Sequence, residues 1–508
     1  MRTKQAFKNA LMSLLLQLTL AVSGILLPRF FIALYGSPVN GLVSSISQFI
    51  SYMGLVEAGI GAAGTVALYR PLAEKNQAEI NGIVSAARSF YQRSGLIFAG
   101  LLAALVLLYP LVVRGEIQDS GFVRTMILVL AINGIVDYFY LGKFRVLLQA
   151  DQRGYVISGF QIIGTVIMTA VSIGLMQFNC SALLVKSVAA GVYLLRSLAV
   201  GLYAKKHYPQ VSFREKPNFS AFNQRWAALL HQIVGMIVNN SAVILLTLLL
   251  AQNALAEVSV YSVYNLVAYA LFGLMNAISN GLGAGFGDVI SRKEMDVLKR
   301  SYSSYEYAFF LIIFVTFCCM LSLLYPFVGL YSTSFTDGVV YLRWPLVILF
   351  SLSVLLQCLR LPGLTVICAA GHYKQTQGRA ITEAAINISI SLVLIRPLGI
   401  VGVMIATCIS YLYRTTDIIL YASKHFVPGT VKSSAARLLR NLIASGILVA
   451  LGLWLIPTNM DGWLTWILSA LVFGTVSCLV LVGINLIFEP QEFKALLQRA
   501  REILGLRP

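Results

Sequence analysis

Fourteen apolar segments, each about 20 residues long, follow one another along this chain. That length lets an α-helix cross the hydrocarbon core of a bilayer, where a helix can satisfy every backbone hydrogen bond within itself. Only 11% of the residues are charged and 58% are hydrophobic, unlike a water-soluble chain. We therefore predict an all-α, polytopic membrane protein with about 14 transmembrane helices. The segments begin near Ala10, Gly41, Phe90, Phe122, Tyr155, Ala182, Trp226, Val258, Tyr305, Val339, Ala380, Ile400, Leu438 and Trp463.

The connections between these segments leave no room for a soluble catalytic domain. The longest of them runs only from Lys205 to Gln224, and the chain has no phosphate-binding loop motif. The four histidines are scattered, and the seven cysteines lack Cys-x-x-Cys spacing. We expect no metal, no cofactor and no enzymatic activity. The alternative, an integral-membrane polysaccharide enzyme, would call for a larger outer loop or an intramembrane histidine.

The net charge of +18 is distributed unevenly between the two sides of the membrane. One side, which includes both termini, carries 27 of the 38 lysines and arginines, while the other carries only Arg114, Arg124 and Arg396. Because basic residues in short loops favour the cytoplasm, both termini are predicted to be cytoplasmic in a cell membrane. The basic charge thus reflects topology and does not indicate a nucleic-acid partner. We interpret the apolar run from Leu11 to Leu34 as an uncleaved first span.

The sequence contains an internal repeat. Leu107–Val112 matches Leu323–Val328 at five of six positions, 216 residues apart, and Gly59–Ala62 corresponds to Gly281–Ala284 at an offset of 222. Six spans separate the copies, so both run in the same direction through the bilayer, as in parallel repeats. The last two spans have no counterpart. The predicted parts are an N-terminal lobe of six spans (1–210), a C-terminal lobe of six spans (211–430) and an appended helix pair with a cytoplasmic tail (431–508).

Several stretches carry a resemblance to a known family. They are Leu27–Phe30 with Tyr35–Gly36 and Asn40–Gly41, Glu57–Gly61 leading to Tyr69–Ala73, Leu148–Arg153, and Lys205–Pro209. With two six-helix lobes and a final pair, the chain resembles the polysaccharide-transporter branch (Wzx-type oligosaccharide flippases) of the multidrug/oligosaccharidyl-lipid/polysaccharide exporter superfamily, whose fold is MATE-like. The resemblance implies transport of an undecaprenyl-pyrophosphate-linked sugar chain by alternating access between the lobes.

Basic residues inside the spans are costly to bury and therefore indicate function. There are eight: Arg29, Lys143, Arg145, Lys186, Arg196, Arg343, Arg360 and Arg414. At helical spacing, Lys186 and Arg196 share one face of span six, and Arg343 and Arg360 share one face of span ten. A cavity walled by both faces would be cationic and would suit a pyrophosphate.

For three of these residues a second interpretation stays open. Lys143 and Arg145 lie near the cytoplasmic boundary and Arg29 near the outer one, where long side chains can extend to the headgroups or pair structurally. Arg29 is nevertheless kept with Lys186, Arg196, Arg343 and Arg360 as a candidate substrate-binding residue.

Uncharged and acidic side chains supply two further hypotheses. Asn265, Asn276 and Asn280 fall on one face of span eight and could hydrogen-bond sugar hydroxyls, or could instead mediate helix packing. Glu57 and Asp137 lie in mid-span and could couple transport to H+ or Na+, or could form buried ion pairs.

These observations favour a flippase that moves a lipid-linked oligosaccharide to the outer leaflet during cell-surface polysaccharide biosynthesis. Its partners would be the lipid-linked substrate, membrane lipids and a polysaccharide polymerase or glycosyltransferase. The alternative within the same superfamily is a MATE-type multidrug exporter, but a strongly basic cavity would repel organic cations.

The charge bias makes a testable prediction about topology. In a cysteine-free background, an impermeant thiol reagent applied outside intact cells should label cysteines placed at Ser120 and Thr336 but not one placed at Asn218. Labelling at Asn218 in intact cells would contradict the proposed orientation.

Overall fold

A computed structural model of the chain describes residues 2–57, 59–222, 225–250 and 252–503. These residues form helices and no strands, and 13 helices are long and apolar enough to cross a membrane. The seventh predicted segment, near Trp226, is not among these 13; it falls on helix α9, whose apolar stretch within the described residues is Asn240–Leu249. The prediction of an all-helical, polytopic membrane protein is confirmed.

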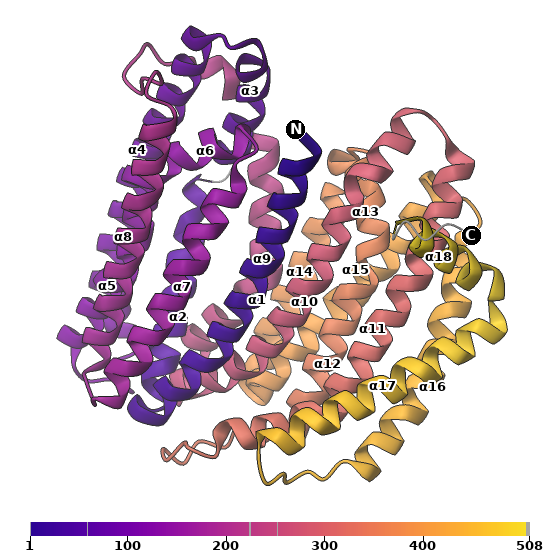
Figure 1. The fold of residues 1–508 in the computed structure, drawn as a ribbon. Coiled ribbons are helices and arrows are strands. Elements are labelled where there is room, and N and C mark those ends of the chain that lie inside the picture. Colours follow the sequence, from indigo (N-terminus) through magenta and orange to yellow (C-terminus); the bar gives the residue numbers. More distant parts are fainter. Residues whose placement is uncertain (1, 58, 223–224, 251, 504–508) are drawn as a thin grey trace. The chain divides into compact units, whose positions relative to one another are not determined.

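The helices divide between two compact units, here called unit 1 (Met1–Leu266 and Phe335–Val339) and unit 2 (Val267–Ser334 and Val340–Pro508). The helix labels are those of Figure 1. Unit 1 contains α1 (Arg2–Tyr35), α2 (Ser37–Met53), η1 (Gly54–Glu57), α3 (Ile60–Glu74), α4 (Gln77–Val112), α5 (Ser120–Val136), η2 (Asp137–Leu141), α6 (Gly142–Ala150), α7 (Gly154–Gln177), α8 (Ala182–His207), η3 (Phe219–Phe222) and α9 (Arg225–Leu249). The predicted lobe boundaries at residues 210 and 430 stay a prediction.

Helix α10 (Ala254–Ser291) begins in unit 1 and continues into unit 2. The remaining helices of unit 2 are α11 (Met295–Ser332), α12 (Trp344–Leu359), α13 (Leu361–Ala369), α14 (Tyr373–Leu398), α15 (Ile400–His425), α16 (Thr430–Leu455), α17 (Trp463–Phe488) and α18 (Pro490–Ile503). Helix α11 packs against α12, α16 and α17, and α15 packs against α12 and α14.

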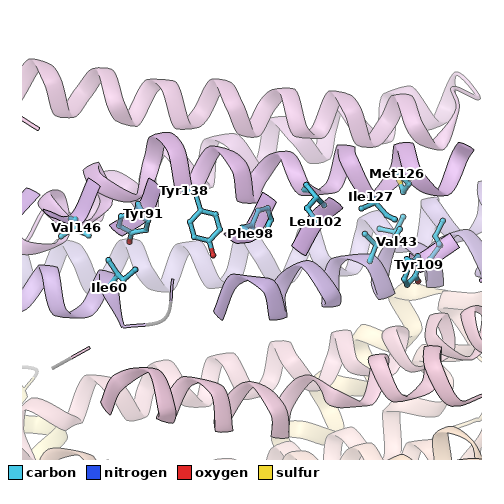
Figure 2. Packing of buried hydrophobic residues seen from close by; sticks show 14 of the residues in the cluster. Val43, Ile60, Tyr91, Phe98, Leu102, Tyr109, Met126, Ile127, Tyr138 and Val146 are labelled. Carbon is cyan, nitrogen blue, oxygen red and sulfur yellow. The ribbon is translucent and has the colours of Figure 1, made fainter. Parts of the chain in front are cut away.

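Aromatic and branched side chains form the core of unit 1. Figure 2 shows a row of them running along the helices, including Tyr91, Phe98 and Tyr138. The rings of Phe98 and Tyr138 lie 5.1 Å apart between their centroids. Burial of such side chains fills the space between α4, α5 and η2, and leaves the opposite faces of these helices for lipid.

Two of the turns between spans consist of a single glycine. Gly36 joins α1 to α2 with φ = 81°, and Gly399 joins α14 to α15 with φ = 55°. These positive φ values favour a residue without a side chain. Longer connections are stabilised by caps: Asp119 accepts hydrogen bonds from the backbone N–H groups of Gly121 (2.9 Å) and Phe122 (3.0 Å) at the start of α5.

Three spans are not continuous helices. Span two is broken by η1 and by Gly59, whose φ is 85°, before α3 resumes. Beyond Gly59, α3 continues this span to Glu74. Span four contains the π-helical turn η2, which begins at Asp137, and span ten is interrupted at Arg360 between α12 and α13.

The close approach of α2 to the first turn of α10 makes a prediction about stability. A Cβ atom on Gly41 would lie 1.8 Å from the backbone oxygen of Leu255, whereas one on Gly24 in α1 would have nothing within 4 Å. Gly41→Ala should therefore lower stability by about 1 to 3 kcal/mol through overpacking, seen as a lower thermal midpoint in detergent. Gly24→Ala is the matched control, and an unchanged midpoint for Gly41→Ala would contradict this packing.

Candidate functional site

A polar cavity of about 540 Å³ lies within unit 1. Its volume is in the range of small-molecule binding sites. Four elements contribute to it: the N-terminal part of α1, the η2–α6 segment, α7 and α8. The lining residues are Asn9, Ser13, Asp137, Leu141, Arg145, Gln149, Gly154, Ile157, Ser158, Gln161, Tyr193 and Arg196. The sequence-predicted residues Asp137 and Arg196 thus face the same space.

Asp137 is held by two donors at this cavity. Its Oδ1 atom lies 3.0 Å from Nη2 of Arg145, and it accepts a hydrogen bond of 2.6 Å from the Tyr193 hydroxyl. The side chains of Arg145 and Asp137 keep 29% and 25% of their surface exposed, so this ion pair remains accessible from the cavity. The sequence left open whether Asp137 couples transport to an ion or forms an ion pair, and whether Arg145 extends to the headgroups or pairs structurally. In the structure these two side chains form an ion pair with each other.

Arg196 and Lys186 lie along one face of α8, as their spacing predicts. Arg196 stacks over the Tyr193 ring at 4.3 Å, and Lys186 lies over the Phe31 ring at 4.4 Å. A second cavity of about 190 Å³ is lined by Lys186, Tyr193 and Arg196, so Tyr193 and Arg196 border both cavities. Among the described residues, no carboxylate pairs with Lys186 or Arg196. Both cations are therefore available to an anion that enters this unit.

Uncharged polar groups surround the cations in the larger cavity. Gln149 on α6 and Ser158 and Gln161 on α7 line it, and within the described part of the chain their side chains make no hydrogen bond to protein. Carboxamides and hydroxyls both donate and accept hydrogen bonds, as sugar hydroxyls do. The Asn9 side chain is already engaged: it donates to the oxygen of Gln152 at 2.9 Å and accepts from the N–H of Tyr155.

Glu57 lies at the end of η1, where span two is broken. It accepts a hydrogen bond of 2.8 Å from the buried Tyr91 hydroxyl. Arg145 interacts electrostatically with both Glu57 and Asp137. One arginine therefore balances the two acidic residues that the sequence singled out in this half of the chain.

In unit 2, Arg360 is part of a buried ion network. Its Nη1 atom lies 2.7 Å from Oε1 of Glu383, and its guanidinium lies over the Tyr411 ring at 4.9 Å. Arg360 is only 9% exposed. Arg414 lies 3.6 Å from the same glutamate and 2.8 Å from Asp417, which is three residues further along α15. The structure thus pairs Arg360 with an acid instead of leaving it open to a cavity.

Sequence reasoning missed Glu383, because it lies close to the predicted start of span eleven. A signal was present: Arg379 and Glu383 are one helical turn apart on α14, and Arg379 in turn pairs with Asp417. Two charged residues one turn apart lie on the same face of a helix. Asp417 on the neighbouring helix α15 pairs with Arg379 on that face of α14.

A second missed network joins the last two spans to α11. Arg437 on α16 lies 3.0 Å from Glu306 on α11 and 2.6 Å from Glu489, which follows α17. Burial acts to raise the pKa of the Glu489 carboxyl, but hydrogen bonds from Arg437 and Arg440 outweigh it and hold that pKa below its usual range. The topology count placed Arg437 and Arg440 in a loop, among the 27 basic residues on the side of the termini. In the structure Arg437 is buried.

The other predicted site residues are more dispersed. Arg29 is half-buried on α1, and Arg343 precedes α12, where its Nε donates to the oxygen of Val340 at 2.9 Å. Asn265 and Asn276 are half-buried on α10, while the side chain of Asn280 lies outside the described residues. For all of these, as for Lys186 and Arg196, substrate binding stays a prediction.

With this geometry in view, the chain was compared with known proteins. No protein-family model and no curated protein sequence matches it. Solved structures do match: lipid II flippase MurJ in an inward closed conformation has a TM-score of 0.68 and 14% identity over 94% of this chain and 98% of that chain. The Vibrio cholerae MATE transporter VcmN, in a mutant form, has a TM-score of 0.58 and 15% identity over 83% and 96%.

A third solved structure is a MOP superfamily transporter from Pyrococcus furiosus, with a TM-score of 0.59 and 12% identity over 83% of this chain and 95% of that chain. At such identities the likeness concerns the fold. The chain therefore has the fold of membrane transporters of the MOP superfamily, in agreement with the predicted MATE-like architecture.

The network around Arg360 makes a prediction about stability. Glu383→Leu should destabilise the protein by about 3 to 5 kcal/mol, because it leaves a buried guanidinium without its partner. Thermal unfolding in detergent would measure this. The control is Glu74→Leu, which breaks the exposed Arg70–Glu74 pair and should cost less than about 1 kcal/mol.

The double variant Arg360→Met with Glu383→Leu removes both charges and should recover most of the lost stability. A double variant as unstable as the single one would show that Arg360 is not held mainly by Glu383.

Proposed function

We propose that this protein is a flippase that carries an undecaprenyl-pyrophosphate-linked oligosaccharide from the cytoplasmic to the outer leaflet of the cell membrane. The observation that carries the proposal is the charge of the cavities in unit 1. Arg145, Arg196 and Lys186 border them together with a single carboxylate, Asp137. Cations inside a membrane protein are expensive, and an excess of them facing a cavity favours an anionic cargo.

The uncharged lining supports the glycan part of the cargo. Gln149, Ser158 and Gln161 offer hydrogen-bond groups without protein partners beside the arginines. A sugar–pyrophosphate headgroup needs both kinds of contact: charge-assisted hydrogen bonds for its phosphates and neutral ones for its hydroxyls. An organic cation needs neither, and Arg145 and Arg196 would repel it.

The fold supports transport by alternating access. The MurJ structure is described as a lipid II flippase in an inward closed conformation, and an anionic lipid-linked cargo is proposed here on the charge of the cavity. The Pyrococcus furiosus transporter is described as having a binding pocket of reversed polarity that suggests a different function. Pocket charge is therefore a reasonable guide to cargo within this fold. Coupling to H+ or Na+ through Glu57, the cytoplasmic location of both termini, and a polymerase or glycosyltransferase partner belong to the same proposal.

The test is a flipping assay in proteoliposomes. The substrate would be undecaprenyl pyrophosphate carrying a fluorescent oligosaccharide, and an impermeant quencher would report its appearance in the outer leaflet. Arg196→Ala should slow flipping at least tenfold, because the phosphates lose a guanidinium partner in a low-dielectric site. Arg196→Lys should retain part of the rate as a point charge without the planar fork.

The matched control is Arg70→Ala, since the Arg70 side chain is 83% exposed and lines neither cavity of unit 1. Wild-type flipping by Arg196→Ala at normal expression would contradict the proposal. Transport of ethidium, with no flipping of the lipid-linked sugar, would favour the multidrug exporter instead.

A further inference from the structure

We propose that Asp137 is an internal competitor of the substrate, occupying Arg145 and Tyr193 in the empty transporter and giving them up when a pyrophosphate binds. This inference rests on the proposed function and concerns how the same site releases its cargo. It starts from the geometry at Oδ1 of Asp137, which accepts both the Tyr193 hydroxyl at 2.6 Å and the Arg145 guanidinium at 3.0 Å. One carboxylate oxygen thus takes up the two donors that a phosphate oxygen would use.

The pair is placed where a ligand can reach it. Asp137, Arg145 and Tyr193 all line the 540 Å³ cavity, and about a quarter of the Asp137 side chain stays exposed. The ion networks of unit 2 differ: Arg360 and Glu383 keep only 10% and 6% of their side chains exposed. Breaking a fully buried ion pair costs much free energy, because each partner is left as an unpaired buried charge. A partly solvated pair is weaker, so an incoming anion can displace its carboxylate.

A second cation makes the exchange favourable. Arg196 has no carboxylate partner in the described part of the chain, and it stacks on Tyr193, the same residue that donates to Asp137. A pyrophosphate drawn in by Arg196 therefore arrives beside the Arg145–Asp137 pair. Its second phosphate can then replace the Asp137 carboxylate on Arg145, and the partly exposed carboxylate turns into the cavity.

The backbone also favours movement at this position. Asp137 is the first residue of the π-helical turn η2, and π-helical turns within α-helices are frequent at functional sites because their hydrogen bonding is locally irregular. Arg145 lies eight residues further on, in α6 beyond this turn. A small change in the π-turn would therefore move the carboxylate relative to the guanidinium without unfolding the span.

The consequence is a balance between affinity and release. Without Asp137, two guanidiniums and a tyrosine hydroxyl would hold the pyrophosphate tightly, and release at the outer leaflet would become slow. With Asp137, the empty site is restored as the carboxylate returns to Arg145. Asp137 therefore lowers the affinity for the headgroup and raises the rate at which the headgroup is released.

The experiment separates affinity from turnover. Binding of geranylgeranyl pyrophosphate to the purified full-length protein in detergent would be measured by calorimetry, with geranylgeraniol as the uncharged control ligand. Asp137→Asn should bind the pyrophosphate roughly two- to fivefold more tightly, which is the change expected on removing a partly exposed ion pair. The same variant should flip the fluorescent lipid-linked sugar more slowly. Asp137→Glu, which keeps the charge, should bind like the wild type.

Two further variants complete the design. Tyr193→Phe removes a donor shared by Asp137 and the ligand but keeps the ring under Arg196, so its affinity should change less than that of Asp137→Asn. Asp288→Asn is the control, because Asp288 forms an exposed pair with Arg292 in unit 2.

Unchanged or weaker binding by Asp137→Asn would overturn the competitor role and indicate that Asp137 only positions Arg145. The proposed function would survive that result if the wild type still binds the pyrophosphate and Arg196→Ala does not. It would fail separately if the wild type showed no preference for the pyrophosphate over the alcohol.

Discussion

The cost of placing charge inside a membrane is the constraint on which most of this structure depends. A charged side chain there must be paired, hydrogen-bonded or turned toward water. The acids within the spans follow this requirement: Glu57 accepts from Tyr91, Asp137 from Arg145 and Tyr193, and Glu383 from Arg360. Each contact joins different helices or helix segments, so the same interactions that neutralise the charges also fix how the spans pack.

The two units meet this requirement in different ways. In unit 2, Arg360, Arg414 and Arg437 are each matched by a nearby carboxylate and have little exposed surface. In unit 1, Lys186 and Arg196 lie against aromatic rings and beside cavities. Aromatic faces stabilise a cation only in part, so these two side chains retain the capacity to bind an anion. The proposed cargo site therefore rests on the charge in unit 1, since these three arginines of unit 2 are paired with carboxylates.

The approximate number of spans, the fold class and the cationic face of α8 could be predicted from the sequence because they depend on local patterns. Apolar length decides whether a segment can span a membrane, and helical spacing places Lys186 and Arg196 on one face. The partners could not be predicted in the same way. Glu383 and Arg437 lie near the ends of apolar runs, where charge is ordinarily solvated, and only the packing of α14 on α15 and of α16 on α11 buries them.

Hydropathy did not predict the breaks within the spans. Each of these breaks lies at a charged residue. The 3-10 turn η1 ends at Glu57, the π-turn η2 begins at Asp137, and α12 ends where Arg360 separates it from α13. Regular α-helical geometry fixes the direction of each side chain, and a charge that must meet one partner inside a membrane has little freedom to adjust. A local change in helical winding supplies that freedom at the cost of one or two backbone hydrogen bonds. In each of these three spans the charged residue at the break contacts a residue later in the chain: Glu57 with Tyr91, Asp137 with Tyr193 and Arg360 with Glu383. At these three positions helix irregularity and charge pairing occur together, whereas Lys186 and Arg196 lie in α8, which is continuous from Ala182 to His207. A mid-span charge therefore does not by itself predict a broken helix.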